Sequence, residues 1–233
     1  MLLFIGLGIA PSICWLLFYL RKDCHPEPKH LIWKTFLMGI IISPLAVLFQ
    51  LGFVKLGLIS SVLTGDAWSF FLWAALVEEM IKFYAVKVIV LDDPEFDEPV
   101  DAMIYMVTAG LGFAAIENIL VMFRVVPDGA SAALGVWTLR FMGAILLHAL
   151  SSAIVGYFLA MSWFYHHHRK KLIVTGLAMA TLFHFAFNSF LSSEEQFVGL
   201  LYSTALLIIM AFLVAILFDK IKEKDPNRRT ISV

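Results

Sequence analysis

The feature that most constrains this chain is a series of seven long apolar stretches separated by short polar joints. They cover residues 2–20, 32–54, 68–90, 101–123, 137–163, 171–191 and 196–218. A helix needs about 20 apolar residues to cross a bilayer, whereas membrane-barrel strands would show shorter, alternating segments. Because 61% of the residues are hydrophobic and only 15% are charged, a soluble globule of this size could not bury the apolar surface. We therefore predict an all-α, polytopic membrane helix bundle of about seven transmembrane helices, and we exclude a soluble enzyme and a nucleic-acid-binding protein.

The positive charges predict the orientation of this bundle, because Lys and Arg gather on the cytoplasmic side of a membrane. Three segments hold most of them: Arg21, Lys22 and Lys29; Arg169, Lys170 and Lys171; and Lys220, Lys222, Lys224, Arg228 and Arg229. The N-terminus is therefore predicted outside and the C-terminus in the cytoplasm. Residues 1–233 are predicted to form one integral-membrane domain with a basic cytoplasmic tail, 219–233. The acidic run 92–101 and the joint His166–His168 are predicted to be solvated.

Three charged side chains lie near the middle of the third apolar stretch, at Glu78, Glu79 and Lys82. Each charge at the centre of a transmembrane helix costs about 2.5–3.5 kcal/mol on insertion scales. On a helix the three side chains fall within roughly 100° of arc, and Glu78 and Lys82 are neighbours one turn apart. We therefore expect all three to face the interior of the bundle.

The next three stretches also contain polar residues where lipid would not accept them. These are Glu117 and Asn118 in the fourth, His148 and Ser152 in the fifth, and His184 and Asn188 in the sixth. Counted from the predicted outer ends at ~1.5 Å per residue, the ionisable groups lie about 11–16 Å deep. Random placement would scatter them over the ~30 Å hydrocarbon core. The sequence therefore predicts one polar layer contributed by four helices.

Glutamates and histidines gathered in one buried layer are typical of a hydrolytic site. A carboxylate can take a proton from water, and an imidazole can bind a metal or stabilise an oxyanion. His148 and His184 can hold Zn²⁺ together with Glu79, or they can act without a metal; the residues leave both versions open. Asn188, Asn118 or Ser152 can orient a substrate or an imidazole, and Lys82 can keep a glutamate ionised.

Structural and functional alternatives also remain open at this stage. The adjacent glutamates can form an ion pair with Lys82, Glu117 can bond a neighbouring helix, and each histidine can be a satisfied core residue. Ser152 shares a face with Gly156, a pattern that favours close helix packing. A proton- or cation-coupled transporter also uses mid-membrane Glu and His, and a non-catalytic sensor or scaffold could retain the layer for packing.

Four motifs in this order resemble the PrsW family of intramembrane proteases, which is distantly similar to the CAAX prenyl-endopeptidase superfamily. The segment EEMIK, 78–82, fits EExxK, and GFAAIEN, 112–118, fits FxxxEN. His148 with Ser152 fits HxxxS, and His184 with Asn188 resembles the last histidine motif, where Asp would fit as well as Asn. The early GIAPS, 8–12, and the segment 27–39 also look like the family, so the resemblance covers nearly the whole chain.

The resemblance implies a multi-pass protease of a bacterial-type cytoplasmic membrane. It implies that the substrate is a membrane-tethered protein, and that the reaction is the first cut in an anti-sigma factor during regulated proteolysis. By resemblance, the catalytic residues are Glu78, Glu79 and His184, followed by Glu117 and His148. The lipid bilayer is the second partner, and no nucleic acid is expected.

Overall fold

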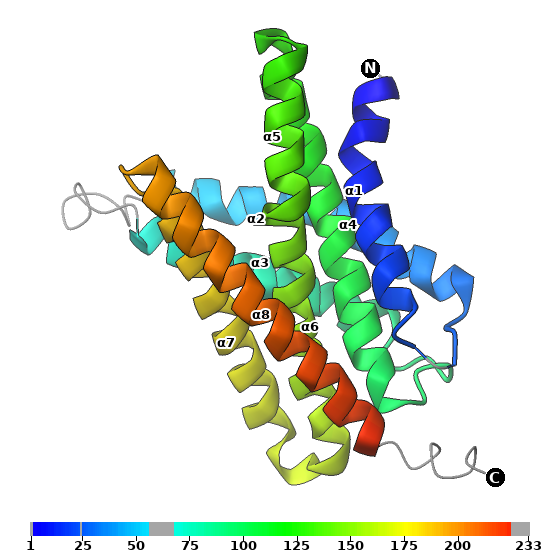
Figure 1. Cartoon of the computed structure of the whole chain (residues 1–233). Helices are drawn as coiled ribbons and strands as arrows, with labels where there is room; N and C mark the ends of the chain where they lie inside the picture. Colours follow the sequence, from blue (N-terminus) through cyan, green and yellow to red (C-terminus); the bar gives the residue numbers. More distant parts are fainter. Residues whose placement is uncertain (1, 24, 56–67, 225–233) are drawn as a thin grey trace.

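The computed structural model describes residues 2–23, 25–55 and 68–224, and within these residues every regular element is a helix (Figure 1). The helices are α1 (Leu2–Leu20), α2 (Lys29–Lys55), α3 (Trp68–Ile89), α4 (Pro99–Val125), α5 (Ala130–Met142), α6 (Ala144–Phe164), α7 (Arg169–Leu191) and α8 (Gln196–Lys224), with short 3-10 turns η1 (Val126–Asp128) and η2 (His166–His168). The predicted all-α class is confirmed for these residues. Of the predicted tail, 219–224 continues α8, whereas the remainder, with Arg228 and Arg229, lies outside the described residues.

Within the described ranges, five helical segments are long and apolar enough to cross a membrane. They are Lys29–Lys55, Pro99–Asp128, Ala130–Phe164, His166–Leu191 and Gln196–Lys224. The apolar part of α1 is shorter, Ile5–Leu20, and α3 carries too many charged residues to meet the same criterion. The chain is therefore a helical membrane protein, while the number of seven spans and their orientation stay predictions.

The fifth apolar stretch was predicted to be one helix over 137–163, but the structure divides it. It consists of α5, which begins earlier, and α6, with a break at Gly143, whose φ of −110° and ψ of −90° are not helical. A Cβ at this position would lie 2.6 Å from the carbonyl oxygen of Leu139, so only glycine fits. Beside the break, the Phe141 carbonyl accepts a hydrogen bond from the Trp15 indole at 2.9 Å. The break is thus fixed by close packing and by a polar contact with α1.

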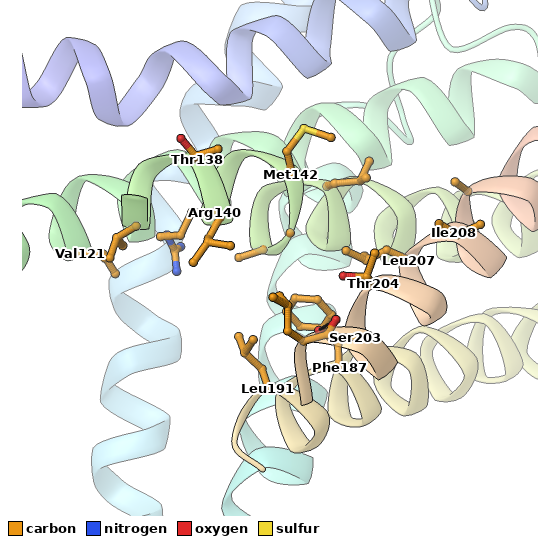
Figure 2. Close-up of a pocket in the computed structure, with 17 residues that line it drawn as sticks. Val121, Thr138, Arg140, Met142, Phe187, Leu191, Ser203, Thr204, Leu207 and Ile208 are labelled. Atoms are coloured by element: carbon orange, nitrogen blue, oxygen red, sulfur yellow. Dashed lines mark hydrogen bonds between the residues drawn. The ribbon is translucent and has the colours of Figure 1, made fainter. Parts of the chain in front are cut away.

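The centre of the bundle is the contact between α4 and α6, whose facing residues are fully buried. Glycines permit this close approach, as at membrane helix interfaces generally. A Cβ at Gly110 would clash with Ser152, and one at Gly156 would lie 2.6 Å from the Cα of Met103. Figures 1 and 2 both show α2 and α3 crossing the α5–α6 column, so α3 reaches α6 and α7 from one side.

The joints predicted to be cytoplasmic lie at one end of the bundle. His25, after α1, forms an ion pair with Glu98, before α4, at 2.7 Å. The Phe96 ring lies 5.0 Å from the ring of Trp163 near the end of α6, and the Lys224 ammonium lies 5.8 Å from the Tyr165 ring. α1 begins at the opposite end (Figure 1). This grouping is the one that the predicted orientation requires.

The acidic run 92–101 is only partly the solvated loop that was predicted. Asp92, Glu95 and Asp97 are exposed, but Glu98 and Asp101 are buried. Asp101 Oδ2 accepts the backbone N–H groups of Glu98 at 2.7 Å and Asp97 at 3.1 Å. The prediction is wrong for these two residues because they form a capping box that begins α4. The joint His166–His168 is exposed, as predicted.

Candidate active site

The predicted polar layer forms one cluster, named here the active-site cluster, between α3, α4, α6 and α7. Its members are Glu78, Glu79, Lys82, Glu117, His148 and His184. Glu79 lies at the centre and is fully buried. Its Oε1 atom accepts hydrogen bonds from Lys82 Nζ at 2.8 Å and Ser151 Oγ at 2.9 Å, and lies 2.8 Å from His184 Nδ1. The predicted convergence of carboxylates and imidazoles is therefore confirmed.

His148 links this centre to Glu117. Its Nδ1 lies 2.8 Å from Lys82 Nζ, and its Nε2 lies 3.0 Å from Glu117 Oε2. An ammonium group has no lone pair, so Nδ1 accepts and the Nε2–H donates to Glu117. This assignment makes His148 a neutral imidazole in contact with both a cation and an anion. The Phe113 ring packs against the pair, 5.0 Å from Lys82 Nζ.

His184 faces both glutamates of α3. Because a carboxylate only accepts hydrogen bonds, Nδ1–H donates to Glu79 and, in a neutral ring, Nε2 keeps its lone pair. That Nε2 lies 3.6 Å from Glu78 Oε2, a buried oxygen without a hydrogen-bond partner among the described residues. The other Glu78 oxygen accepts a hydrogen bond from Gln50 Nε2 at 3.0 Å. Two electron-rich atoms therefore face each other in a buried position, which a proton or a cation between them would stabilise.

The same residues fit a divalent metal. Glu78, His148 and His184 each offer a ligand atom, and these atoms lie within 4.8 Å of one another, the one such group in the described part of the chain. Two imidazoles and a carboxylate are a donor set that suits zinc. Glu79 would then orient His184 through its other ring nitrogen, as carboxylates do around zinc-bound histidines. The sequence predicted His148, His184 and Glu79 as the metal ligands. In the structure, the group that could hold a metal contains both histidines but has Glu78 in place of Glu79.

Three predicted orienting residues lie around the cluster rather than in it. Asn118 donates to the Gly8 carbonyl at 2.9 Å and accepts from Arg140 Nε at 3.0 Å, and so ties α1 and α5 to α4. Ser152 faces Gly110 at the α4–α6 contact, and its hydroxyl has no partner among the described residues. Asn188 lies one turn after His184, half-buried, with no side-chain hydrogen bond to the part of the chain that the structure describes.

Sequence reasoning missed three polar residues that complete the cluster. Gln50 from α2 holds Glu78, and Ser151 from α6 donates to Glu79. Arg140 lies 3.6 Å from Glu117 Oε2 through Nη2, and its side chain is 19% exposed. Gln50 and Arg140 carried a usable signal, because each is a strongly polar residue inside or beside an apolar stretch. Ser151 carried none, because serine is common at helix contacts in membranes.

Comparison with known proteins finds similar sequences over most of the chain. Residues 27–217 match the family described as "PrsW family intramembrane metalloprotease". Protease PrsW of Geobacillus kaustophilus is 29% identical over 194 residues, which cover 82% of this chain and 81% of that protein. Protease PrsW of Oceanobacillus iheyensis is 30% identical over 84% of this chain and 86% of its own length, and that of Bacillus subtilis is 27% identical over 83% and 85%. No solved structure matches the chain.

Proposed function

Since this chain belongs to the PrsW family of intramembrane metalloproteases, and so is a membrane-embedded peptidase, we propose that its active-site cluster hydrolyses a peptide bond of a membrane-tethered protein. The observation that carries this proposal is the buried pair of His184 Nε2 and Glu78 Oε2, 3.6 Å apart, with Glu79 holding the other nitrogen of the ring at 2.8 Å. Membership of a protease family favours this activity over the proton-coupled transporter and over the non-catalytic scaffold.

Glu78, His148 and His184 would hold the metal, and the metal when bound supplies Lewis-acid polarisation of the scissile carbonyl and makes a water molecule more acidic. Coordination by His148 through Nε2 requires that it release Glu117, since both of its nitrogens are engaged. Glu79 has three contacts on one oxygen and acts as the residue that orients His184. Lys82 balances its charge.

Glu117 is the residue we assign to proton transfer. Its side chain is 31% exposed, whereas those of Glu78 and Glu79 are 8% and 0% exposed. It takes the proton from the attacking water as the water oxygen bonds to the carbonyl carbon. It then gives that proton to the leaving amine as the C–N bond breaks, which leaves a carboxylic acid and an amine; the acid then gives its proton to the amine, and the final products are a carboxylate and an ammonium group. Arg140, beside it, keeps Glu117 ionised before attack.

A metal-free version uses the same residues differently. There Glu78 Oε2 is the base, and His184 with His148 stabilises the oxyanion. Elemental analysis and exhaustive chelation separate the two versions. The metal version predicts about one zinc-like ion per purified chain, loss of that ion in Glu78→Ala and His184→Ala, and loss of activity after chelation. Full activity of a metal-free preparation would contradict the metal version.

The finer part of the proposal concerns topology and substrate. Seven spans with the N-terminus outside and the C-terminus cytoplasmic would open the cluster toward the outer leaflet of a bacterial cytoplasmic membrane. By resemblance to the family, the substrate is an anti-sigma factor, and the cut is the first step of a proteolytic cascade. Reporter expression from the sigma factor concerned would rise only with the active chain.

The central experiment maps new N-termini of membrane proteins in cells that express wild type, Glu79→Gln or His184→Ala. We expect new termini in single-span proteins with wild type and none with either variant. Glu95→Gln and His166→Ala are matched controls, because both residues are exposed in joints. All four variants must insert at wild-type levels. New termini that persist in both active-site variants would contradict the proposed peptidase centre.

A further inference from the structure

A lateral cleft lies beside the active-site cluster, between α5 and α8 (Figure 2). Its volume is about 630 Å³. Its walls are the apolar side chains of α5 and α8, and its floor is formed around Gly143 and Phe187. Figure 2 shows Val121 and Arg140 at one end of the cleft and Ile208 at the other. The helix break at Gly143 therefore opens directly onto this cleft.

The cleft adjoins the active-site cluster at two of its lining residues. Arg140 lines the cleft, and its Nη2 lies 3.6 Å from Glu117 Oε2. Phe187 lines its floor and follows His184 by three residues on α7, one turn away. A molecule in the cleft would thus lie next to the most exposed carboxylate of the cluster. No other element separates Arg140 from Glu117, since the two form an ion pair.

The chemistry of Arg140 selects among occupants. Its Nη2 is a buried donor without a hydrogen-bond partner in the described residues. Lipid acyl chains match the apolar walls but offer no acceptor to this donor. A transmembrane helix offers only carbonyl oxygens that already accept a hydrogen bond within the helix. An unwound apolar peptide matches both, because it presents apolar side chains to the walls and free carbonyl oxygens to the guanidinium.

The volume of the cleft limits the occupant to a short segment and excludes a whole transmembrane helix. One turn of helix, about 10–12 Å wide and 5.4 Å long, occupies roughly 420–610 Å³. The cleft therefore accommodates about one turn or a few residues of extended chain, far less than a span of about 20 residues. Ser203 and Thr204, also in the lining, supply the polar side chains of the α8 wall.

We propose that this cleft binds an unwound segment of the substrate's transmembrane helix, and that Arg140 positions it by donating a hydrogen bond to a backbone carbonyl. This inference rests on the proposed function, since it names where the membrane-tethered substrate binds before the cut. It makes Arg140 a substrate-positioning residue and the α5–α8 opening the lateral entrance. Substrates with a helix-breaking pair such as Gly–Gly in the span bind best.

The test is photo-crosslinking of a synthetic peptide with protein in lipid nanodiscs. The probe is a Lys-flanked Leu/Ala span with a central Gly–Gly, and its partner peptide has Ala–Ala at the same place. The photoreactive residue p-benzoylphenylalanine replaces either Ile208, which lines the cleft, or Ile209, which does not. The two side chains are similarly exposed, Ile208 at 53% and Ile209 at 60%. Both proteins also carry Glu79→Gln, so the measurement needs no hydrolysis.

We expect the Ile208 position to crosslink the Gly–Gly peptide at least fivefold more than the Ile209 position, and more than it crosslinks the Ala–Ala peptide. Arg140→Met lowers the yield about tenfold, the effect of losing one hydrogen bond to a charged group. Thr204→Trp, which fills the cleft without touching Arg140, lowers it as well, whereas Ala205→Trp, outside the lining, does not. The Trp pair keeps the test valid if Arg140→Met does not fold.

Equal yields at both positions, or adducts to lipid alone from the Ile208 position, would overturn the docking site. An unchanged yield in a folded Arg140→Met protein would overturn the role of Arg140. Cleavage of the same peptide by wild type is measured separately. Crosslinking without cleavage would refute the proposed function and retain the docking site. Cleavage without crosslinking would refute the docking site and retain the proposed function.

Discussion

Two groups of carboxylates among the described residues, each with buried members, are satisfied in different ways. In the joint cluster, formed by Glu27, Glu98, Asp101 and Tyr105, Asp101 caps α4 through backbone N–H groups and Tyr105 donates to Glu27. In the active-site cluster, the partners are side chains from separate helices, and Glu78 and Glu79 each keep an oxygen without a hydrogen bond. The first group ties helix ends together, and it too contains a buried oxygen without a hydrogen bond, Asp101 Oδ1. The second group sets its carboxylates beside two imidazoles, and the ligand atoms of Glu78, His148 and His184 lie within 4.8 Å of one another. The convergence of carboxylates with imidazoles, and not buried charge or an unpaired oxygen alone, marks the site of chemistry.

The largest expected difference between the two clusters is in activity. Glu79→Gln should lower the rate of peptide cleavage by about 10²–10⁴-fold, the range typical of groups that serve proton transfer or its orientation. Asp101→Asn, an equally conservative change of a fully buried carboxylate, should leave the rate per folded molecule within about twofold of wild type. The measurement is cleavage of one single-span substrate by purified variants, normalised to folded protein. Similar losses in both variants would remove the distinction between the clusters.

The next effect is on stability and concerns Lys82, which is fully buried with Glu79 at 2.8 Å. Lys82→Met should lower the free energy of unfolding by about 3–5 kcal/mol, because it leaves a buried carboxylate without its cation. Unfolding in mixed detergent micelles measures this loss. The double variant Lys82→Met/Glu79→Gln should recover part of it, since the remaining group is then neutral. A double variant as unstable as the sum of the two single variants would show that Lys82 acts through packing alone.

The sequence allowed much of the site to be predicted because apolar stretches make polar residues conspicuous. Glu78, Glu79 and Lys82 could be placed in the interior since lipid would not accept them. A count of depth from the outer ends holds only for helices that run alongside one another. Although α3 crosses the α5–α6 column, the groups still meet, because a crossing helix can contribute its middle turn.

Other features could not be predicted because their cause is a contact distant in sequence. The Phe141 carbonyl beside the break at Gly143 accepts a hydrogen bond from Trp15, 126 residues away in the sequence, and a glycine in an apolar stretch does not by itself signal a break. The burial of Glu98 and Asp101 depends on how the first joint packs over the start of α4. Both residues look like members of a solvated acidic loop until that packing is known.

A smaller effect tests whether the joint cluster is structural. Asp101→Ala should lower the free energy of unfolding by about 0.5–2 kcal/mol, the typical value for loss of a helix cap. Its Oδ2 atom accepts two backbone N–H groups, which the variant leaves unpaired. Thermal unfolding in detergent measures the loss, with exposed Asp92→Ala as the matched control. A stability equal to wild type would mean that the capping box contributes nothing to α4.

The smallest expected effect is a pH dependence of stability at one residue of the joint cluster, Glu27. Burial raises the pKa of Glu27, which lies between α1 and α2, although hydrogen bonds from Asp101 and Tyr105 partly oppose it. The folded protein therefore keeps this proton to a higher pH than the unfolded chain does. Its contribution to stability is complete in acid and is lost as pH rises through the folded-state pKa. Glu27→Gln should remove that loss. The melting temperature of this variant should therefore fall less than that of wild type between acidic and neutral pH. The control is Glu95→Gln, which changes an exposed glutamate of another joint and should follow wild type. Parallel curves for wild type and Glu27→Gln would contradict the assignment, because the cluster would then not hold a proton at this position.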